Sequence, residues 1–100
     1  LQKLLKAAGY STAIFGKWHL GHGVTDHVDR PDHDGPDAVP ADPVGFDHYS
    51  VLPGHGRYHD PELITPAGRA EVKGYVSDIL TDQALEWLSA RSATDPPFFL

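Results

Sequence analysis

The most informative part of the sequence is AGYSTAIFGKWHLGHG, residues 8–23. Its first half contains Tyr, Thr, Ile and Phe, side chains that favour β-strands. The run Ala13-Ile14-Phe15 is continuously apolar, as in a strand buried on both faces. Glycines at 16, 21 and 23 would let the backbone turn sharply or approach a ligand closely. Lys17 and His19 therefore stand two residues apart where a buried strand is expected to end.

Helical patterns flank this strand. Leu1, Leu4, Leu5 and Ala8 have the i, i+3, i+4, i+7 spacing of one helix face, and Gly9 can end that helix in a left-handed conformation. A second helix is predicted near the C-terminal end by six apolar residues at helical spacing: Val76, Ile79, Leu80, Ala84, Trp87 and Leu88.

Residues 45–72 are interpreted as short extended pieces, with a hairpin of residues 62–65 and 69–72 about Pro66. After the second helix, Asp95-Pro96-Pro97 prevents helical continuation, and Phe98 begins another strand. We expect only two buried parallel strands, one at residues 13–15 and one at Phe98. The element order predicts an α/β fold, layered, with a mainly parallel sheet flanked by helices.

Composition and charge argue against several classes of function. The 100 residues suffice for one small domain, and the formal net charge is −6. Lys and Arg are scattered singly, which disfavours nucleic-acid binding. No apolar run approaches the ~20 residues of a membrane-spanning helix. Residue 1 already lies in a helical pattern and the last three residues resemble a strand cut short, so we expect an internal fragment, incomplete at both ends.

Lys17 and His19 are the candidate catalytic residues. In an extended backbone residues i and i+2 point the same way, and ligands of open α/β sheets collect beyond the carboxyl ends of strands. A lysine there can neutralise an anionic ester group, and a histidine can exchange a proton with an attacking or leaving oxygen. A Lys-x-His pair also fits an ordinary surface, with Trp18 packed in the core, and spacing alone leaves that reading open.

The same residues resemble a known family. GYSTAIFGKWHLG, residues 9–21, looks like the second signature of the sulfatases, and the lead-in LQKLLKAAGY is also similar. Downstream, GFDHYSVLPGHGRYHDPELI, GYVSDILTDQALEWL and PPFFL resemble family segments in the same order. The resemblance covers residues 1–100, except that residues 26–42 match least.

The resemblance implies a partial alkaline-phosphatase-like fold and hydrolysis of sulfuric esters by the parent protein. It implies a calcium ion and a formylglycine made from Cys or Ser. The residue matching Lys17 would contact the sulfate and the formylglycine, and the residue matching His19 would bond the formylglycine hydroxyls and help eliminate sulfate. Expected substrates are sulfated small molecules or sulfated carbohydrates, and export to the periplasm or outside the cell is typical of the family.

The chain carries only part of this machinery. It has no Cys, and none of its serines begins a Ser-x-Pro-x-Arg motif. The nucleophile and the calcium ligands are therefore expected outside residues 1–100, and the isolated chain is expected to be inactive and poorly folded. The alternatives are a phosphonate monoester or phosphodiester hydrolase of the same superfamily, and a truncated non-catalytic product.

Three polar groups have weaker interpretations. The Asp/His-rich loop of residues 22–34 could form a small metal-binding module, although an exposed loop explains its composition equally well. In LPGHGRYHDP, Arg57 could pair with a substrate anion, but a polar connector is the favoured reading, since no spacing places it near Lys17. The acids at 78, 82 and 86 fit a solvated helix face. The members of the first two groups are His22, His27, His33, Asp26, Asp29, Asp32 and Asp34, and His55, Arg57, Tyr58 and His59.

Overall fold

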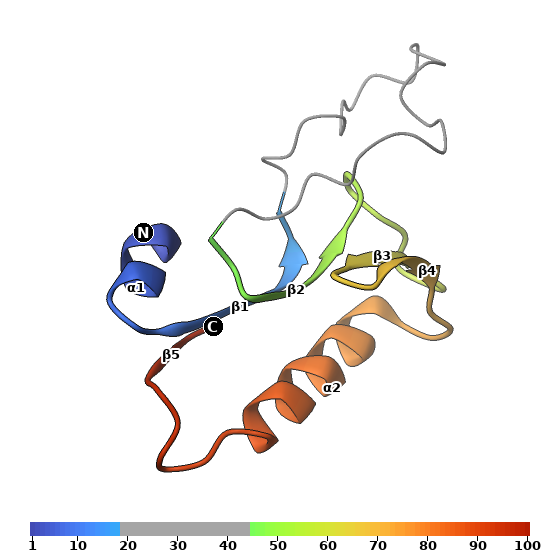
Figure 1. Ribbon diagram of the computed structural model, residues 1–100. Coiled ribbons are helices and arrows are strands. Elements are labelled where there is room, and N and C mark those ends of the chain that lie inside the picture. The colour runs from blue at the N-terminus through green and yellow to red at the C-terminus, as the bar shows by residue number, and fades with distance from the viewer. Residues whose placement is uncertain (19–44) are drawn as a thin grey trace.

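The computed structural model of the chain describes residues 1–18 and 45–100 (Figure 1). Its elements are α1 (Gln2–Ala7), β1 (Ser11–Lys17), β2 (His48–Leu52), β3 (Glu62–Thr65), β4 (Gly68–Glu71), α2 (Val76–Ser89) and β5 (Phe98–Phe99). The strands form one five-stranded sheet in the order β4-β3-β2-β1-β5. The α/β fold is confirmed, and the hairpin and the second helix lie close to their predicted positions.

The sheet is mixed. β1 pairs in parallel with β2 on one side and with β5 on the other, whereas β2–β3 and β3–β4 are antiparallel. Figure 1 shows β1 and β2 running side by side and α2 lying along the sheet. Parallel pairing is thus confined to β2-β1-β5, and the β3–β4 hairpin extends the sheet beyond β2.

The expectation of only two parallel strands is wrong, because β2 is a third. Its last four residues, from Tyr49 to Leu52, are all buried. Tyr49 and Val51 pack with Ile64 on one face, and Leu52 packs with Leu63 and Val76 on the other. The pattern His-Tyr-Ser-Val-Leu is a weak strand signal, because Ser50 interrupts its apolar residues although only 1% of its surface is exposed.

The C-terminal end of α2 contacts β5 through an aromatic cluster. The Trp87 ring meets the Phe98 ring edge-on at a centroid distance of 5.7 Å, and the Arg91 guanidinium lies 4.4 Å from the centre of the Trp87 ring. Trp87, predicted to be a core residue, is half-buried. In the described part of the chain, no helix combines the length and apolarity needed to cross a bilayer.

A hydrogen-bond network joins α1, β1 and the entry to β2. The carboxylate of Asp47 accepts a bond from the Thr12 backbone N–H at 3.0 Å and forms an ion pair with Lys6 at 2.7 Å. The Thr12 hydroxyl, in a residue with no exposed surface, donates to the Gly45 carbonyl at 2.9 Å. The Lys6 hydrogen bond, followed by those from Thr12, holds the pKa of Asp47 below its ordinary value.

Asp47→Ala should lower the free energy of unfolding by about 1–3 kcal/mol, because it leaves the buried Thr12 N–H without an acceptor. The measurement is urea denaturation of the intact protein at pH 7. Lys6→Ala is the matched control: it removes only the exposed ion pair and should cost at most about 1 kcal/mol. Equal losses for the two variants would show that the Thr12 bond contributes nothing.

The stabilising effect of Asp47 should also depend on pH. The pKa of its carboxyl is lower in the folded state than the ordinary 3.8, so the stabilisation is complete above that value and is lost as the pH falls through the folded pKa. The stability difference between wild type and Asp47→Ala should therefore shrink between neutral pH and pH values below 3.8. A difference that grew on acidification would contradict the proposed role of the carboxylate.

Candidate active site

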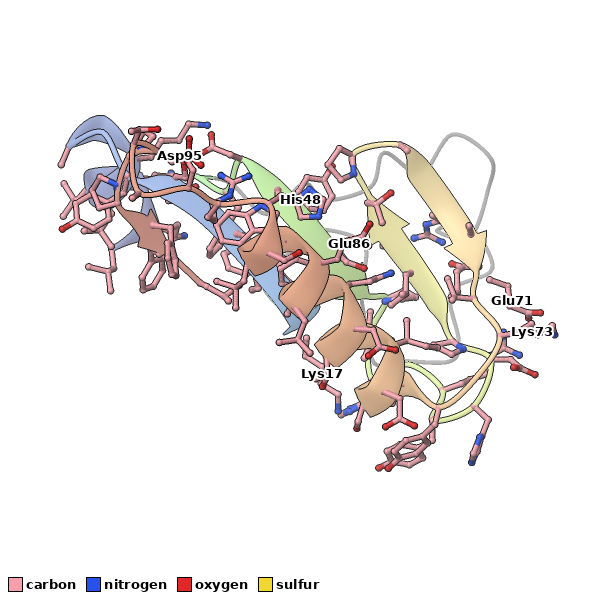
Figure 2. All side chains as sticks on the ribbon, turned by 90° about the horizontal axis from the view of Figure 1, so that it is seen from below. Lys17, His48, Glu71, Lys73, Glu86 and Asp95 are labelled. Atoms are coloured by element: carbon pink, nitrogen blue, oxygen red, sulfur yellow. The ribbon has the colours of Figure 1, made fainter. Side chains whose placement is uncertain are left out.

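Lys17 is the last residue of β1 and is exposed. β1 lies between two parallel neighbours, so Lys17 stands at the carboxyl edge of the parallel part of the sheet, where α/β proteins bind ligands. Figure 2 shows its side chain extending past the tip of the strand. Lys17 forms no ion pair with any residue of the described segments 1–18 and 45–100, so none of their carboxylates neutralises its charge.

The residues around Lys17 are anchored. The Phe15 ring lies 5.4 Å from that of His48, and the Trp18 ring meets Phe46 edge-on at 5.6 Å. Trp18 also packs against the cluster of Tyr49, Val51 and Ile64, so its predicted contact with the core is confirmed. The backbone on both sides of Lys17 is therefore fixed by aromatic packing while the lysine side chain itself reaches solvent.

The other predicted catalytic residue, His19, lies outside the described residues, as does the Asp/His-rich loop of residues 22–34. Their proposed roles stay predictions. Among the described residues, no group of three or more His, Asp or Glu side chains could hold a metal ion. Since the chain also has no Cys and none of its serines begins a Ser-x-Pro-x-Arg motif, its described part fits neither a calcium site nor a formylglycine precursor.

The connector between β2 and β3 begins beside Lys17. The spacing of residues along the sequence did not indicate this proximity. Lys17 is the register partner of Leu52, the last residue of β2, so the connector starts at the same edge of the sheet. Arg57, however, is held elsewhere: its guanidinium donates to Glu71 of β4 at 2.8 Å. Ala70 precedes Glu71 in β4. When the pairing register is followed from Lys17 through β2 and β3, Ala70 lies three strand spacings away, or about 14 Å between the Cα atoms of Lys17 and Ala70.

Arg57 belongs to a hairpin charge cluster of Arg57, Asp60, Glu71 and Lys73. Lys73 lies 2.7 Å from Glu71 and 3.4 Å from Asp60. Hydrogen bonds from Lys73 and then Arg57 lower the pKa of Glu71, and the bond to Glu71 raises the pKa of Lys73. Figure 2 shows Glu71 and Lys73 together at the hairpin, apart from Lys17. The two cations and two anions balance, which favours the reading of a polar connector.

The remaining predicted residues fit their structural interpretations. The acids at 78, 82 and 86 are exposed on α2, as expected of a solvated face. His59 packs its ring on Tyr75 at 5.3 Å, and Tyr58 is exposed. Sequence reasoning missed Asp47 as the partner of Thr12, but it did indicate that the backbone at Gly16 could be unusual, and the φ there is +135°. A glycine inside a strand pattern was the available signal for Gly16.

Comparison with known proteins identifies the family of this chain. The family model described as Sulfatase matches residues 1–100. The N-acetylglucosamine-6-O-sulfatase of Bacteroides thetaiotaomicron is 37% identical over 97 residues, covering 94% of this chain and 14% of that protein. The N-acetylgalactosamine-6-sulfatase of Mus musculus is 34% identical over an alignment of 113 residues, covering 100% of this chain and 20% of that protein.

A solved structure gives the same result. It is 37% identical and superposes with a TM-score of 0.66 over 97% of this chain and 16% of its own, and its title describes a complex with the substrate D-glucosamine-2-N,6-O-disulfate. The chain thus spans about a seventh to a fifth of the length of the curated relatives named above. The match over every residue nevertheless establishes the relationship, and the chain belongs to the sulfatase family.

Proposed function

We propose that this chain is part of a sulfuric ester hydrolase and forms one wall of its active site. The observation that carries the proposal is the position of Lys17, an exposed cation at the carboxyl edge of β2-β1-β5 in a chain that matches the sulfatases throughout. The negative charge on the non-bridging oxygens of a sulfate monoester requires a cationic partner, and a lysine ammonium supplies one.

In this proposal Lys17 binds and orients the sulfate group. The anchored Phe15 and Trp18 restrict where its backbone can move, which lowers the entropy lost when the ammonium meets the substrate. His19 supplies or removes a proton at an ester oxygen. The nucleophile comes from outside residues 1–100, because the chain has no Cys and no Ser-x-Pro-x-Arg motif.

The proposed substrate class is sulfated carbohydrate. Support comes from the names of relatives that act on sulfated amino sugars, and from the disulfated glucosamine bound in the similar structure. A phosphonate or phosphodiester substrate is the less favoured alternative, because the relatives named above are all sulfatases.

Lys17→Ala in the intact protein should reduce kcat/KM for 4-nitrophenyl sulfate and for N-acetylglucosamine 6-sulfate by about 10²–10³-fold, the range for losing one electrostatic contact to the transition state. His19→Ala should reduce kcat/KM for the same two substrates by about 10²–10⁴-fold. Released sulfate and 4-nitrophenol are measured, with bis(4-nitrophenyl) phosphate as the comparison substrate. Lys73→Ala is the control and should retain activity, since Lys73 is paired with Glu71 at the hairpin and lies apart from Lys17. Faster turnover of the phosphodiester, or a fully active Lys17→Ala, would overturn the proposal.

Arg57→Ala should leave KM for both sulfate esters within about twofold, because Glu71 already holds the guanidinium at the hairpin and exposed pairs of this kind contribute little. Arg69→Ala is the matched control: Arg69 forms a similar exposed pair with Glu62 at 3.1 Å. The measurement is KM for the two sulfate esters, from steady-state kinetics of both variants. A tenfold rise in KM for Arg57→Ala with no change for Arg69→Ala would identify Arg57 as a substrate contact.

A further inference from the structure

Gly16 has a positive φ in the interior of a strand, whereas Gly68, the other described strand residue with a positive φ, begins β4 at the hairpin turn. The φ of Gly16 is +135°, although it lies inside β1 and both its neighbours are strand residues. The parallel ladder continues through it, with Gly16 opposite Val51 and Lys17 opposite Leu52. The unusual φ is therefore built into a paired strand and does not arise from a loose chain end.

Steric crowding does not explain why glycine occupies this position. A Cβ added at Gly16 would have no atom within 4 Å. Space for a side chain exists, but an L-residue is strained at this φ and costs about 1–3 kcal/mol there. What the glycine provides is the backbone conformation itself.

That conformation controls the direction of Lys17. An L-residue at position 16 would favour the ordinary parallel-strand φ of about −120°, a rotation of roughly 105° about the N–Cα bond. Residues on both sides of Gly16 are held, by pairing to β2 and by the Phe15–His48 and Trp18–Phe46 ring contacts, so the rotation would strain both sides. Lys17 directly follows Gly16, and its exposed side chain would change direction.

We propose that Gly16 is a positioning residue whose left-handed φ aims the Lys17 ammonium at the anionic group of the substrate. This inference rests on the proposed function, since it requires Lys17 to bind sulfate. Gly16 itself touches no substrate, and it acts through the side chain that follows it. A misplacement of about 1 Å at such a contact can cost 10²-fold in rate.

Gly9 provides a matched control. It also has a positive φ, +93°, and an added Cβ there would likewise meet nothing within 4 Å. It lies before β1, at the opposite end from Lys17. Gly9→Ala and Gly16→Ala should therefore lower the thermal unfolding temperature by similar amounts, while only Gly16→Ala changes the function of Lys17.

The test is a double-mutant cycle in the intact protein. Gly16→Ala should lower kcat/KM for 4-nitrophenyl sulfate by about 10²-fold and weaken the binding of inorganic sulfate, measured by calorimetry, by about tenfold. In a Lys17→Ala background the same substitution should change both by less than threefold, because two residues acting through one contact are not additive. Gly9→Ala should leave both within threefold of wild type.

Equal losses from Gly16→Ala in the wild-type and the Lys17→Ala backgrounds would overturn the inference and leave Gly16 a structural residue. Full activity of Lys17→Ala alone would instead overturn the proposed function. If Gly16→Ala does not fold, Gly16→Asn carries the same cycle, since Asn tolerates positive φ better than Ala. Gly16→Asn should bind inorganic sulfate more weakly than wild type, and an affinity equal to that of wild type would count against the inference.

Discussion

The structure depends on the parallel pairing of β1 with β2. That register sets Lys17 opposite Leu52 and so brings the candidate catalytic lysine to the same edge as the connector after β2. It also places β2 where both its faces are covered, one by the cluster around Val51 and the other by residues of β3 and α2. The Thr12–Asp47 bonds fix this pairing at its start, because Asp47 directly precedes β2.

The two ends of β1 have different physical characters. At its beginning, Thr12 is fully buried and all its polar atoms named above have partners. At its end, Lys17 is exposed and is not paired with any described carboxylate. A rigid strand thus connects a saturated hydrogen-bond network to a cation available to a ligand. Sites held on rigid elements are more precise than sites on loops, and here β1 is held by pairing with β2 through to Lys17 and with β5 at Ser11 and Thr12.

Much of this could be predicted from the sequence, for identifiable reasons. The hairpin followed from Pro66 and Gly68 between strand-like residues, and α2 followed from its apolar spacing, so both are local signals. Lys17 at the end of a strand followed from the glycine after an apolar run. Extended structure was expected in the region of β2, but its burial and its parallel pairing with β1 could not be predicted, because they depend on partners distant in the chain. The ion pair of Arg57 with Glu71 depends on tertiary structure that residue identity does not encode. The glycine at position 16 permits a positive φ but does not by itself fix it at +135°.

The pairing of β1 also has a consequence for the order of folding. Thr65 and Gly68 close the β3–β4 hairpin locally, and such turns form within about 1–10 μs. By contrast, Ala13 pairs with His48 and Ser11 with Phe98, partners separated by 35 and 87 residues. Contacts between such distant residues form slowly, because the entropy of closing the intervening chain is lost before the pairing stabilises it. We therefore expect the surroundings of Lys17 to be completed after the hairpin and α2 have formed.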